Sequence, residues 1–269
     1  MAPLRLVTWN VNGLRAVERK GALAPALASL APDVLLLQEI KGRPEQFSDA
    51  LVAHPDFRQF YHPAQRPGYA GTGVWVRRTL PCNDLTIVRE VPHLVNADEG
   101  RVTEVRCVLA GCAYSFLSVY FPNGGKSPQA WKEKLIFYDQ MLAYITQLHE
   151  AGRIVILGGD FNVAHTPQDL ARPKANEGHI GFHPDERAWM DRLTAAGWVD
   201  VWRAQHPRAV QYTWWDQLTR ARERNVGWRI DYFIVHEKHF PRVRESRIAD
   251  EVMGSDHCPV LMTFAPPRC

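Results

Sequence analysis

The sequence predicts one α/β domain spanning residues 1–269, in which two mixed β-sheets pack face to face and carry helices on their outer sides. Three observations support this fold class. Short apolar runs recur along the chain, segments with helical periodicity separate some of them, and no linker or internal repeat interrupts the sequence. A chain of 269 residues with 46% hydrophobic content can form one large core, although two small domains are the alternative.

The strand predictions rest on the length and residue types of the apolar runs. Each run is short and rich in β-branched or aromatic residues, which favours strands over helices. The predicted strands are Leu4–Val11, Val34–Gln38, Thr72–Val76, Val102–Leu109, Ala113–Tyr120, Arg153–Leu157, Ile230–His236 and Val260–Phe264. Short connections between several of them indicate antiparallel neighbours.

Three segments have the pattern of helices. Ser127 and Pro128 are typical of an N-cap followed by the first helical residue. The apolar face that follows consists of Trp131, Leu135, Tyr138, Leu142 and Ile145, and the pattern ends near Gly152. A second helix is predicted from Pro184 to Gly197, and Leu23 to Leu30 belongs to another. The loop of residues 164–184 is long, as functional loops often are.

Composition and charge narrow the classes of function. The formal net charge of +3 and the pI near 8.6 permit a polyanionic partner without requiring one. The five cysteines form no C-x-x-C motif, which disfavours a disulfide framework or a zinc site and fits a reducing compartment. No signal peptide and no run of about 18 apolar residues is visible. We therefore expect a cytoplasmic protein without a membrane partner.

Polar side chains stand where the predicted strands end. Alternate residues of a strand share a face, so Asn10 and Asn12 point the same way while Trp9 and Val11 face the core. The other residues of this kind are Glu39, Tyr120, Asn123, Asp160, Asn162, Asp256 and His257, and Asp231 lies inside the strand Ile230–His236. Their recurrence at five strand ends predicts that they gather into one site.

Each of these residues also has an ordinary structural explanation. A lone Asp or Asn after a strand is usually a turn or cap residue, and Glu39 with Lys41 would suit a solvated ion pair. Asp231 is different, because an unpaired carboxylate inside a strand is costly to bury. It needs a partner, and His257 is the candidate. The ordinary explanation is adequate for most residues singly but not for the whole set.

The chemistry of the set suits phosphodiester hydrolysis. Carboxylate and amide oxygens are the ligands preferred by Mg²⁺ or Mn²⁺, whereas zinc prefers His and Cys. A bound metal polarises a phosphoryl oxygen and stabilises the leaving oxygen. Asp231 would hold one nitrogen of His257 and favour the imidazolium, which suits contact with a phosphate.

At this point the motifs resemble a known family. T-W-N-V-N-G-L-R-A, L-L-Q-E-I-K, Y-F-P-N, G-D-F-N-V-A-H, N-V-G-W-R-I-D-Y and G-S-D-H-C-P are similar to motifs of the exonuclease III family of abasic-site (AP) endonucleases. The resemblance runs from about Leu4 to Phe264 in the same order. It implies a DNase I-like four-layer α/β sandwich, with the site at one edge of the paired sheets.

The resemblance also implies a role for each residue of the site. Asn10 and Glu39 bind Mg²⁺, for which Mn²⁺ can substitute, with Asp256 nearby. His257 contacts the scissile phosphate and is oriented by Asp231. By the same resemblance, Asp160 positions or deprotonates the attacking water, and Asn162 helps to hold the transition state. Tyr120 lies by the phosphate or the leaving oxygen. A second metal site would use Asp160, Asn162 and His257, and the choice between one metal and two stays open.

A further set of residues is implied to contact DNA. Trp214, Trp228 and Ile230 match the walls of an apolar pocket for a flipped sugar without its base, and Leu218 matches a wedge into the duplex. Extruding a nucleotide costs least where no base is stacked, so a pocket too small for a base selects the lesion. The remaining implied DNA contacts are Arg15, Lys41, Asn123, Lys126 and Asn176. Ordinary core packing is the alternative for the tryptophans.

Two positions bear on the reaction within this family. Gly181 matches a position beside the pocket, where a small residue leaves room for an internal abasic site and a bulky one favours 3′-end trimming. Asn12 departs from the pattern, because some relatives have aspartate there.

The leading hypothesis is that the protein hydrolyses the phosphodiester 5′ to an abasic site in double-stranded DNA and leaves a 3′-hydroxyl. Side activities would be those of a 3′-phosphodiesterase and a 3′-to-5′ exonuclease, acting on 3′-blocked ends. We expect the enzyme to be a monomer. The main alternative is an enzyme acting chiefly as a 3′-to-5′ exonuclease or 3′-phosphatase. A phosphatase of inositol lipids or sphingomyelin is disfavoured, because the resemblance implies a tryptophan-lined pocket and no membrane-binding stretch is visible in the sequence. A non-catalytic DNA-binding module is disfavoured by the clustered acids.

Overall fold

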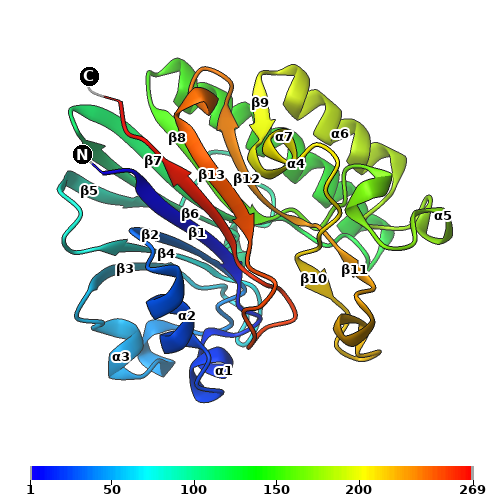
Figure 1. Cartoon of the computed structure of the whole chain (residues 1–269), viewed down its shortest axis with the longest axis horizontal. Coiled ribbons are helices and arrows are strands. Elements are labelled where there is room, and N and C mark those ends of the chain that lie inside the picture. Colours follow the sequence, from blue (N-terminus) through cyan, green and yellow to red (C-terminus); the bar gives the residue numbers. More distant parts are fainter. Residues whose placement is uncertain (1, 268–269) are drawn as a thin grey trace.

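Two six-stranded β-sheets form the centre of the molecule (Figure 1). The computed structural model describes residues 2–267. The first sheet has the order β13-β14-β1-β2-β4-β3 and comprises β1 (Leu4–Asn10), β2 (Val34–Gln38), β3 (Phe57–His62), β4 (Thr72–Arg77), β13 (Val243–Ile248) and β14 (Val260–Phe264). The second has the order β5-β6-β7-β8-β12-β9 and comprises β5 (Cys82–Val88), β6 (Val102–Leu109), β7 (Cys112–Tyr120), β8 (Ile154–Asp160), β9 (Trp198–Asp200) and β12 (Asp231–His236).

Most neighbouring strands are antiparallel, and each large sheet also contains a parallel pair. In the first sheet this pair is β1 with β2, and in the second it is β7 with β8. A small separate ribbon pairs β10 (Trp214–Trp215) with β11 (Gly227–Trp228). Both large sheets are therefore mixed, as the sequence predicts.

Helices cover the outer face of each sheet. The α-helices are α1 (Leu14–Arg19), α2 (Leu23–Leu30), α3 (Asp49–Val52), α4 (Pro128–Glu150), α5 (Pro173–Asn176), α6 (Pro184–Ala195) and α7 (Val201–Gln205). The 3₁₀ helices are η1 (Pro44–Gln46), η2 (Ala97–Glu99), η3 (Pro167–Asp169), η4 (Ala221–Arg224) and η5 (Phe240–Arg242). No helix in residues 2–267 is long and apolar enough to cross a membrane.

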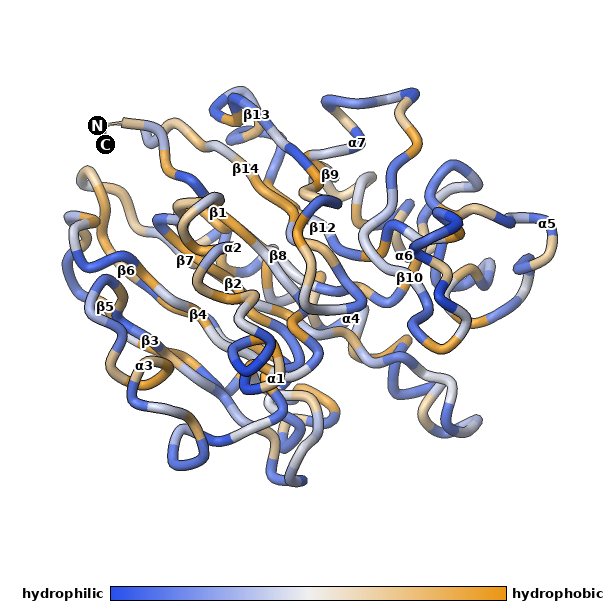
Figure 2. The backbone as a smooth tube through the Cα atoms, turned by 60° about the horizontal axis from the view of Figure 1, so that its bottom comes forward, coloured by the Kyte–Doolittle hydropathy of each residue, from blue (hydrophilic) through white to orange (hydrophobic). Residues whose placement is uncertain are grey.

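Three apolar clusters hold four layers together. The central cluster joins the facing sides of the sheets, for example Leu36 of β2 with Phe233 of β12. A second cluster packs α1 and α2 on the first sheet, and a third packs α4 and α6 on the second. The strands at these interfaces are the apolar stretches in Figure 2, whereas many connecting segments are hydrophilic. The predicted four-layer α/β sandwich is confirmed.

The predicted elements are present, with small differences in their bounds. The first strand ends at Asn10 because Asn12 has a positive φ of 45°, which interrupts extended backbone. The helix predicted after Ser127 begins at Pro128, and the Ser127 hydroxyl accepts a 3.1 Å hydrogen bond from the Ala130 amide. Cys82, Cys107 and Cys258 are free thiols, whereas Cys112 is disulfide-bonded, a bond that the sequence analysis did not predict.

The sequence analysis did not predict several short or edge elements. The edge strands of the two large sheets are β3, β5, β9 and β13. Two of them, β5 and β13, contain several exposed polar residues. Because an edge strand need not be apolar on both faces, it lacks the continuous apolar run on which the predictions depended. The helices α1, α3, α5 and α7 are too short to show a repeating apolar face.

The two sheets approach each other closely beside the carboxyl end of β8. A Cβ atom added to Gly158 would lie 2.7 Å from Leu36 Cδ1 and 3.0 Å from Thr8 Cβ, both in the opposite sheet. Beside this contact the buried Gln38 amide donates hydrogen bonds to Thr8 Oγ1 (3.1 Å) and to Ser118 Oγ (2.9 Å). Because Ser118 belongs to β7, this polar link also ties one sheet to the other.

We expect Gly158→Val to lower the free energy of unfolding by about 1–3 kcal/mol, because the added side chain overpacks the contact between the sheets. Urea unfolding followed by circular dichroism measures this change. The exposed strand substitution Thr86→Val serves as a control and should change the free energy by no more than about 0.5 kcal/mol. A Gly158→Val variant as stable as the wild type would contradict the close approach.

Candidate active site

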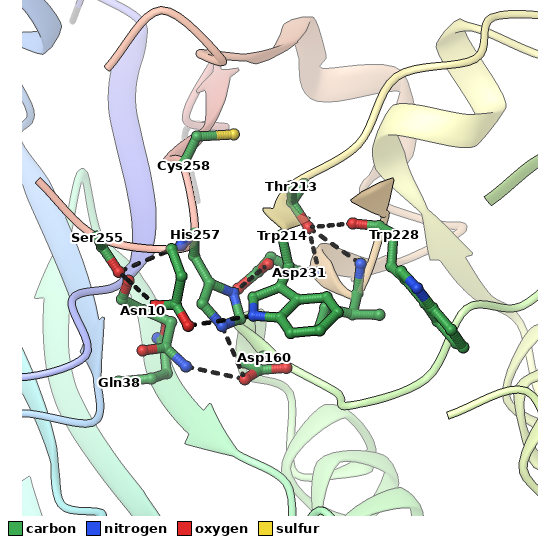
Figure 3. A network of polar contacts seen from close by, with 12 residues as sticks. Asn10, Gln38, Asp160, Thr213, Trp214, Trp228, Asp231, Ser255, His257 and Cys258 are labelled. Carbon is green, nitrogen blue, oxygen red and sulfur yellow. Dashed lines mark hydrogen bonds and ion pairs between the residues drawn. The ribbon is translucent and has the colours of Figure 1, made fainter. Parts of the chain in front are cut away.

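The polar strand-end residues meet at one edge of the paired sheets (Figure 3). The strand register explains part of this arrangement, because Asp160 at the end of β8 lies beside Tyr120 of β7 on one side and Asp231 of β12 on the other. Asn10 ends β1 in the opposite sheet, and His257 precedes β14. Asn10 Nδ2 donates a 2.9 Å hydrogen bond to Asp160 Oδ2, which closes the site across the two sheets.

His257 and Asp231 form a buried pair, as the sequence predicts. The His257 Nδ1 atom lies 2.9 Å from Asp231 Oδ2, and its Nε2 atom lies 3.8 Å from Asp160 Oδ2. Burial alone would lower the pKa of His257, but the charges of Asp231 and Asp160 raise it to about 10. The ring is therefore an imidazolium at neutral pH and directs a positive charge at Asp160.

Asp160 is buried among other charges. Its Oδ1 atom accepts a 2.9 Å hydrogen bond from the Asn162 amide. Burial raises the pKa of Asp160 to about 7; the nearby His257 charge opposes this rise, whereas Asp231 and Glu39 add to it. A carboxyl group with a pKa near neutrality can both accept and release a proton at physiological pH, which is what acid–base catalysis requires.

Glu39 and its neighbours form the side of the site that belongs to the first sheet. Glu39 Oε1 accepts a 2.9 Å hydrogen bond from Asn10 Nδ2, and its Oε2 atom lies 2.8 Å from Lys41 Nζ. The backbone here is strained, because Asn12, Glu39 and Lys41 all have positive φ angles between 45° and 51°. Asn162, at φ 52°, has the same conformation across the site.

Asp256 is held by hydrogen bonds on both of its carboxylate oxygens. Asn12 Nδ2 donates to Oδ1 at 2.8 Å, and Trp214 Nε1 donates to Oδ2 at 3.2 Å. Burial alone would raise the pKa of Asp256, but the charge of His257 and these hydrogen bonds lower it. Asp256 is therefore ionised at neutral pH. Asn12 contacts this aspartate and Lys41, which the sequence analysis did not foresee.

Three side chains are grouped closely enough to hold a metal ion. Ligand atoms of Glu39, Asp160 and His257 all lie within 4.8 Å of one another. Asp231 Oδ1 is a further buried oxygen with no hydrogen-bond partner among the described residues. Two carboxylates suit a divalent cation, and the His257 imidazole can join them only after it loses its second ring proton. The group contains Glu39, which was expected in the first metal site, together with Asp160 and His257, which were expected in the second. Asp256, also expected in the first site, is not part of the group.

A pocket of about 340 Å³ adjoins this group. It is lined by Glu39, Tyr120, Asn123, Asp160, Asn162, Ile180, Gly181, Trp214, Trp228, Ile230, Asp256 and His257. Trp214 and Trp228 pair across the β10–β11 ribbon and meet edge to face, with ring centroids 6.5 Å apart. The Tyr120 side chain at the far wall is buried, which raises its pKa well above 10 and keeps the phenol protonated.

Gly181 leaves space at the pocket wall. Its φ is +87°, and an added Cβ would lie 3.2 Å from Trp228 Cζ3. A side chain here would be strained and would press on the tryptophan wall. Gly181 therefore lies at the pocket wall beside Trp228, and its role in admitting an internal abasic site stays a prediction.

The remaining residues expected to contact DNA lie outside the pocket. Leu218, in the turn after β10, is 95% exposed. Lys126 Nζ donates a 2.9 Å hydrogen bond to the Tyr69 hydroxyl, and Asn176 donates to the Arg172 carbonyl. Arg15 is exposed on α1 and lines a separate hollow with Lys41.

Some functional contacts were missed by sequence reasoning. Thr213 Oγ1 accepts hydrogen bonds from the backbone amides of Ile230 (3.0 Å) and Asp231 (3.1 Å). Ser255 Oγ donates to the Asn10 carbonyl at 2.8 Å, linking the loop before His257 to β1. Ser255 is adjacent to the aspartate and histidine of G-S-D-H, which was an available signal, whereas a lone threonine carries none.

Comparison with known proteins agrees with this geometry. Residues 7–257 match the model of the endonuclease/exonuclease/phosphatase family. An exodeoxyribonuclease of Bacillus subtilis is 36% identical over 260 residues, which cover 96% of this chain and 98% of the relative. The DNA repair nuclease APEX1 of Danio rerio is 32% identical over 267 residues, covering 98% of this chain and 83% of the relative.

Solved structures resemble the whole chain. The AP endonuclease LMAP from Leishmania major has a TM-score of 0.85 at 27% identity, covering 99% of this chain and 89% of that one. The 3′ phosphatase NExo from Neisseria, bound to a product DNA hairpin, has a TM-score of 0.83 at 26% identity, covering 98% and 100%. Fold and site together define a hydrolytic enzyme of phosphate esters. The chain belongs to the endonuclease/exonuclease/phosphatase family, and the predicted resemblance is confirmed.

We expect Asp231→Asn to lower the pKa of His257, because the substitution removes the closest negative charge. NMR titration of the imidazole without divalent metal measures the pKa, which is about 10 in the wild type against an ordinary 6.5. Since the folded-state pKa is raised, this charge stabilises the fold fully below about pH 6.5 and no longer does so once pH rises through about 10. An unchanged titration in the variant would show that Asp231 does not control the ring.

Proposed function

We propose that the enzyme cuts the phosphodiester 5′ to an abasic site within double-stranded DNA and leaves a 3′-hydroxyl. The observation that carries this proposal is the small pocket beside the group of acids and His257. Its tryptophan walls suit a sugar without a base, and Gly181 leaves room for a sugar joined to DNA on both sides. Extruding such a sugar costs less than extruding a stacked nucleotide, so the pocket selects the lesion.

In this proposal the reaction is divided among the residues of the site. Asp160 positions the attacking water and takes up its proton, which the raised pKa of Asp160 favours. The His257 imidazolium contacts the scissile phosphate, and Asp231 orients the ring. Asn162 donates to the transition state, and the protonated Tyr120 hydroxyl lies by the phosphate or the leaving oxygen.

The proposed cofactor is Mg²⁺, with Mn²⁺ as a substitute. Glu39 would hold the ion with Asn10 and Asp256. A two-metal reaction, which is the open alternative, would place the second ion at Asp160, Asn162 and a neutral His257 in place of the imidazolium. The carboxylate oxygens favour a hard cation of this kind. When bound, the ion would neutralise phosphate charge and polarise a phosphoryl oxygen. In the structure the Asn10 amide nitrogen faces the carboxylates, so its oxygen would turn toward the ion on binding.

We propose that DNA is bound by the surface around the pocket. Leu218 is exposed enough to enter the duplex as a wedge, and Trp214, Trp228 and Ile230 contact the flipped sugar. The other proposed contacts are Arg15, Lys41, Asn123, Lys126 and Asn176. We propose further that the chain is a single domain, acts as a monomer in the cytoplasm, and serves base excision repair.

A second candidate function is 3′-to-5′ trimming or 3′-phosphatase action at duplex ends. The likeness to the 3′ phosphatase from Neisseria favours it. Both reactions use the same phosphate chemistry and differ in whether DNA continues beyond the pocket. The open wall at Gly181 favours incision within a strand as the main activity, with end trimming as a side activity.

We expect a duplex with one internal abasic analogue to be cut at the lesion when Mg²⁺ or Mn²⁺ is present, and to remain intact in chelator. Gel analysis of an end-labelled strand measures both cutting and trimming. Asp160→Asn and His257→Ala should abolish cutting while binding of the duplex, measured by fluorescence anisotropy, changes little. Trimming from the ends without cutting at the lesion would favour the second function instead.

We expect Trp228→Ala to reduce lesion cutting more than end trimming, because it removes a wall of the pocket but no group near the phosphate. A loss of about tenfold in kcat/KM for the internal lesion corresponds to roughly 1.4 kcal/mol of transition-state stabilisation. Trp202→Phe, a change at a buried tryptophan outside the pocket, is the control. Equal losses of both activities in Trp228→Ala would argue against the proposed pocket.

A further inference from the structure

A buried ion pair lies directly beneath the active site. Lys134 of α4 and Glu186 of α6 are both fully buried, and the Lys134 ammonium contacts Glu186 Oε1. The two helices pack against the second sheet with this pair between them. Such a pair is weak evidence for stability, since apolar residues of similar size often serve as well. Its contacts suggest another reason for it.

The Lys134 ammonium binds the backbone of two residues of the active site. Its Nζ atom donates to the Asn123 carbonyl at 3.1 Å and to the Asn162 carbonyl at 2.9 Å. Toward Glu186 the ammonium forms an ion pair, and Glu186 Oε1 has no hydrogen-bond partner among the described residues. Asn123 follows β7 and Asn162 follows β8, so both lie beyond the ladder hydrogen bonds of the sheet. Packing is close, because a Cβ on Gly124 would lie 2.9 Å from Lys134 Cδ.

Glu186 binds the backbone of the pocket wall. Its Oε2 atom accepts a 2.8 Å hydrogen bond from the Gly181 amide and a 2.9 Å hydrogen bond from the His183 amide. Gly181 has a positive φ of 87°, a conformation that a residue with a side chain would rarely adopt. Asn123, Asn162 and Gly181 all line the pocket. Asn123 follows β7, and Asn162 and Gly181 lie near opposite ends of the connection between β8 and α6. The ion pair therefore ties together three segments beyond the strand ends. It does so in addition to the hydrogen bonds from Asn123 Nδ2 to Asn162 Oδ1 (3.2 Å) and from the Ala164 amide to the Gly181 carbonyl (2.8 Å).

We propose that Lys134 and Glu186 are positioning residues, which hold the phosphate side of the site and the wall of the sugar pocket in one fixed geometry. This inference rests on the proposed function. Neither side chain reaches the pocket, so both act through Asn123, Asn162 and Gly181. A displacement of about 1 Å in such groups can cost a hundredfold in rate, even when the change lies away from the reacting atoms.

The test replaces the pair by apolar residues of similar size, Lys134→Met with Glu186→Leu. Because no buried charge is left alone, the double variant should still fold, with a melting temperature lowered by the loss of the hydrogen bonds to four backbone groups. We expect kcat for the internal abasic analogue to fall about tenfold or more, while KM changes by less than about threefold, because the exposed DNA contacts remain. A purely structural role would change the melting temperature and leave kcat of the folded enzyme unchanged.

The matched control is Tyr144→Phe, on the same helix and about 15 Å further along it at 1.5 Å per residue. It removes a hydrogen bond to the buried Glu104, away from the site, and should change stability but not kcat. If the double variant does not fold, kcat of the single variant Glu186→Gln tests the positioning role instead. Its amide retains one acceptor for Gly181 but faces Lys134 with no negative charge, so kcat should fall in the folded protein.

The outcomes separate this inference from the proposed function. A folded double variant, or a folded Glu186→Gln variant, with the kcat of the wild type would overturn the positioning role and leave the proposed function intact. A wild type that does not cut at the lesion would instead contradict the proposed function. A fall in kcat in the folded variants, with Tyr144→Phe unaffected, would support the positioning role.

Discussion

The close approach of the two sheets beside Gly158 is the constraint on which the site depends. Leu36 and Thr8 of one sheet occupy the space that a side chain at Gly158 would take in the other. Where the sheets approach in this way, Asn10 at the end of β1 donates a hydrogen bond to Asp160 at the end of β8. The Gln38 link between the sheets, which satisfies its polar groups where water is excluded, fixes that separation.

Several carboxylates buried close together repel one another when no cation is bound between them. Two pKa shifts follow from this crowding: the pKa of Asp160 is raised, and the pKa of His257 is raised so that the ring keeps its second proton. The backbone contributes as well, because Glu39 and Asn162 face each other across the site in left-handed conformations that non-glycine residues rarely adopt. Strain and charge concentrated at one edge of an otherwise regular sandwich are the physical marks of a functional site.

Sequence reasoning succeeded where one local rule decides the outcome. An aspartate inside an apolar strand needs a partner, which predicted the pairing of Asp231 with His257, and strand ends predicted the location of Asp160 and Asn162. It failed where contacts depend on three-dimensional packing. Lys134 occupies an ordinary position in the helix pattern, and its burial follows only from the way α4 and α6 pack together. The sequence analysis also missed edge strands such as β13, because the residues of an edge strand that face solvent are polar and interrupt the apolar run.

Recognition and chemistry share the same short segments of backbone. Thr213 Oγ1 binds the amides of both Ile230, a wall of the pocket, and Asp231, the partner of His257. Next to Thr213, Trp214 forms another wall and donates its indole N–H to Asp256. A shift of the pocket wall must therefore move the groups that orient the imidazolium and the neighbouring carboxylate. In the proposed reaction, correct seating of the sugar and correct placement of the phosphate are therefore one geometric condition, and the proposed selectivity for a lesion needs no separate reading of base sequence.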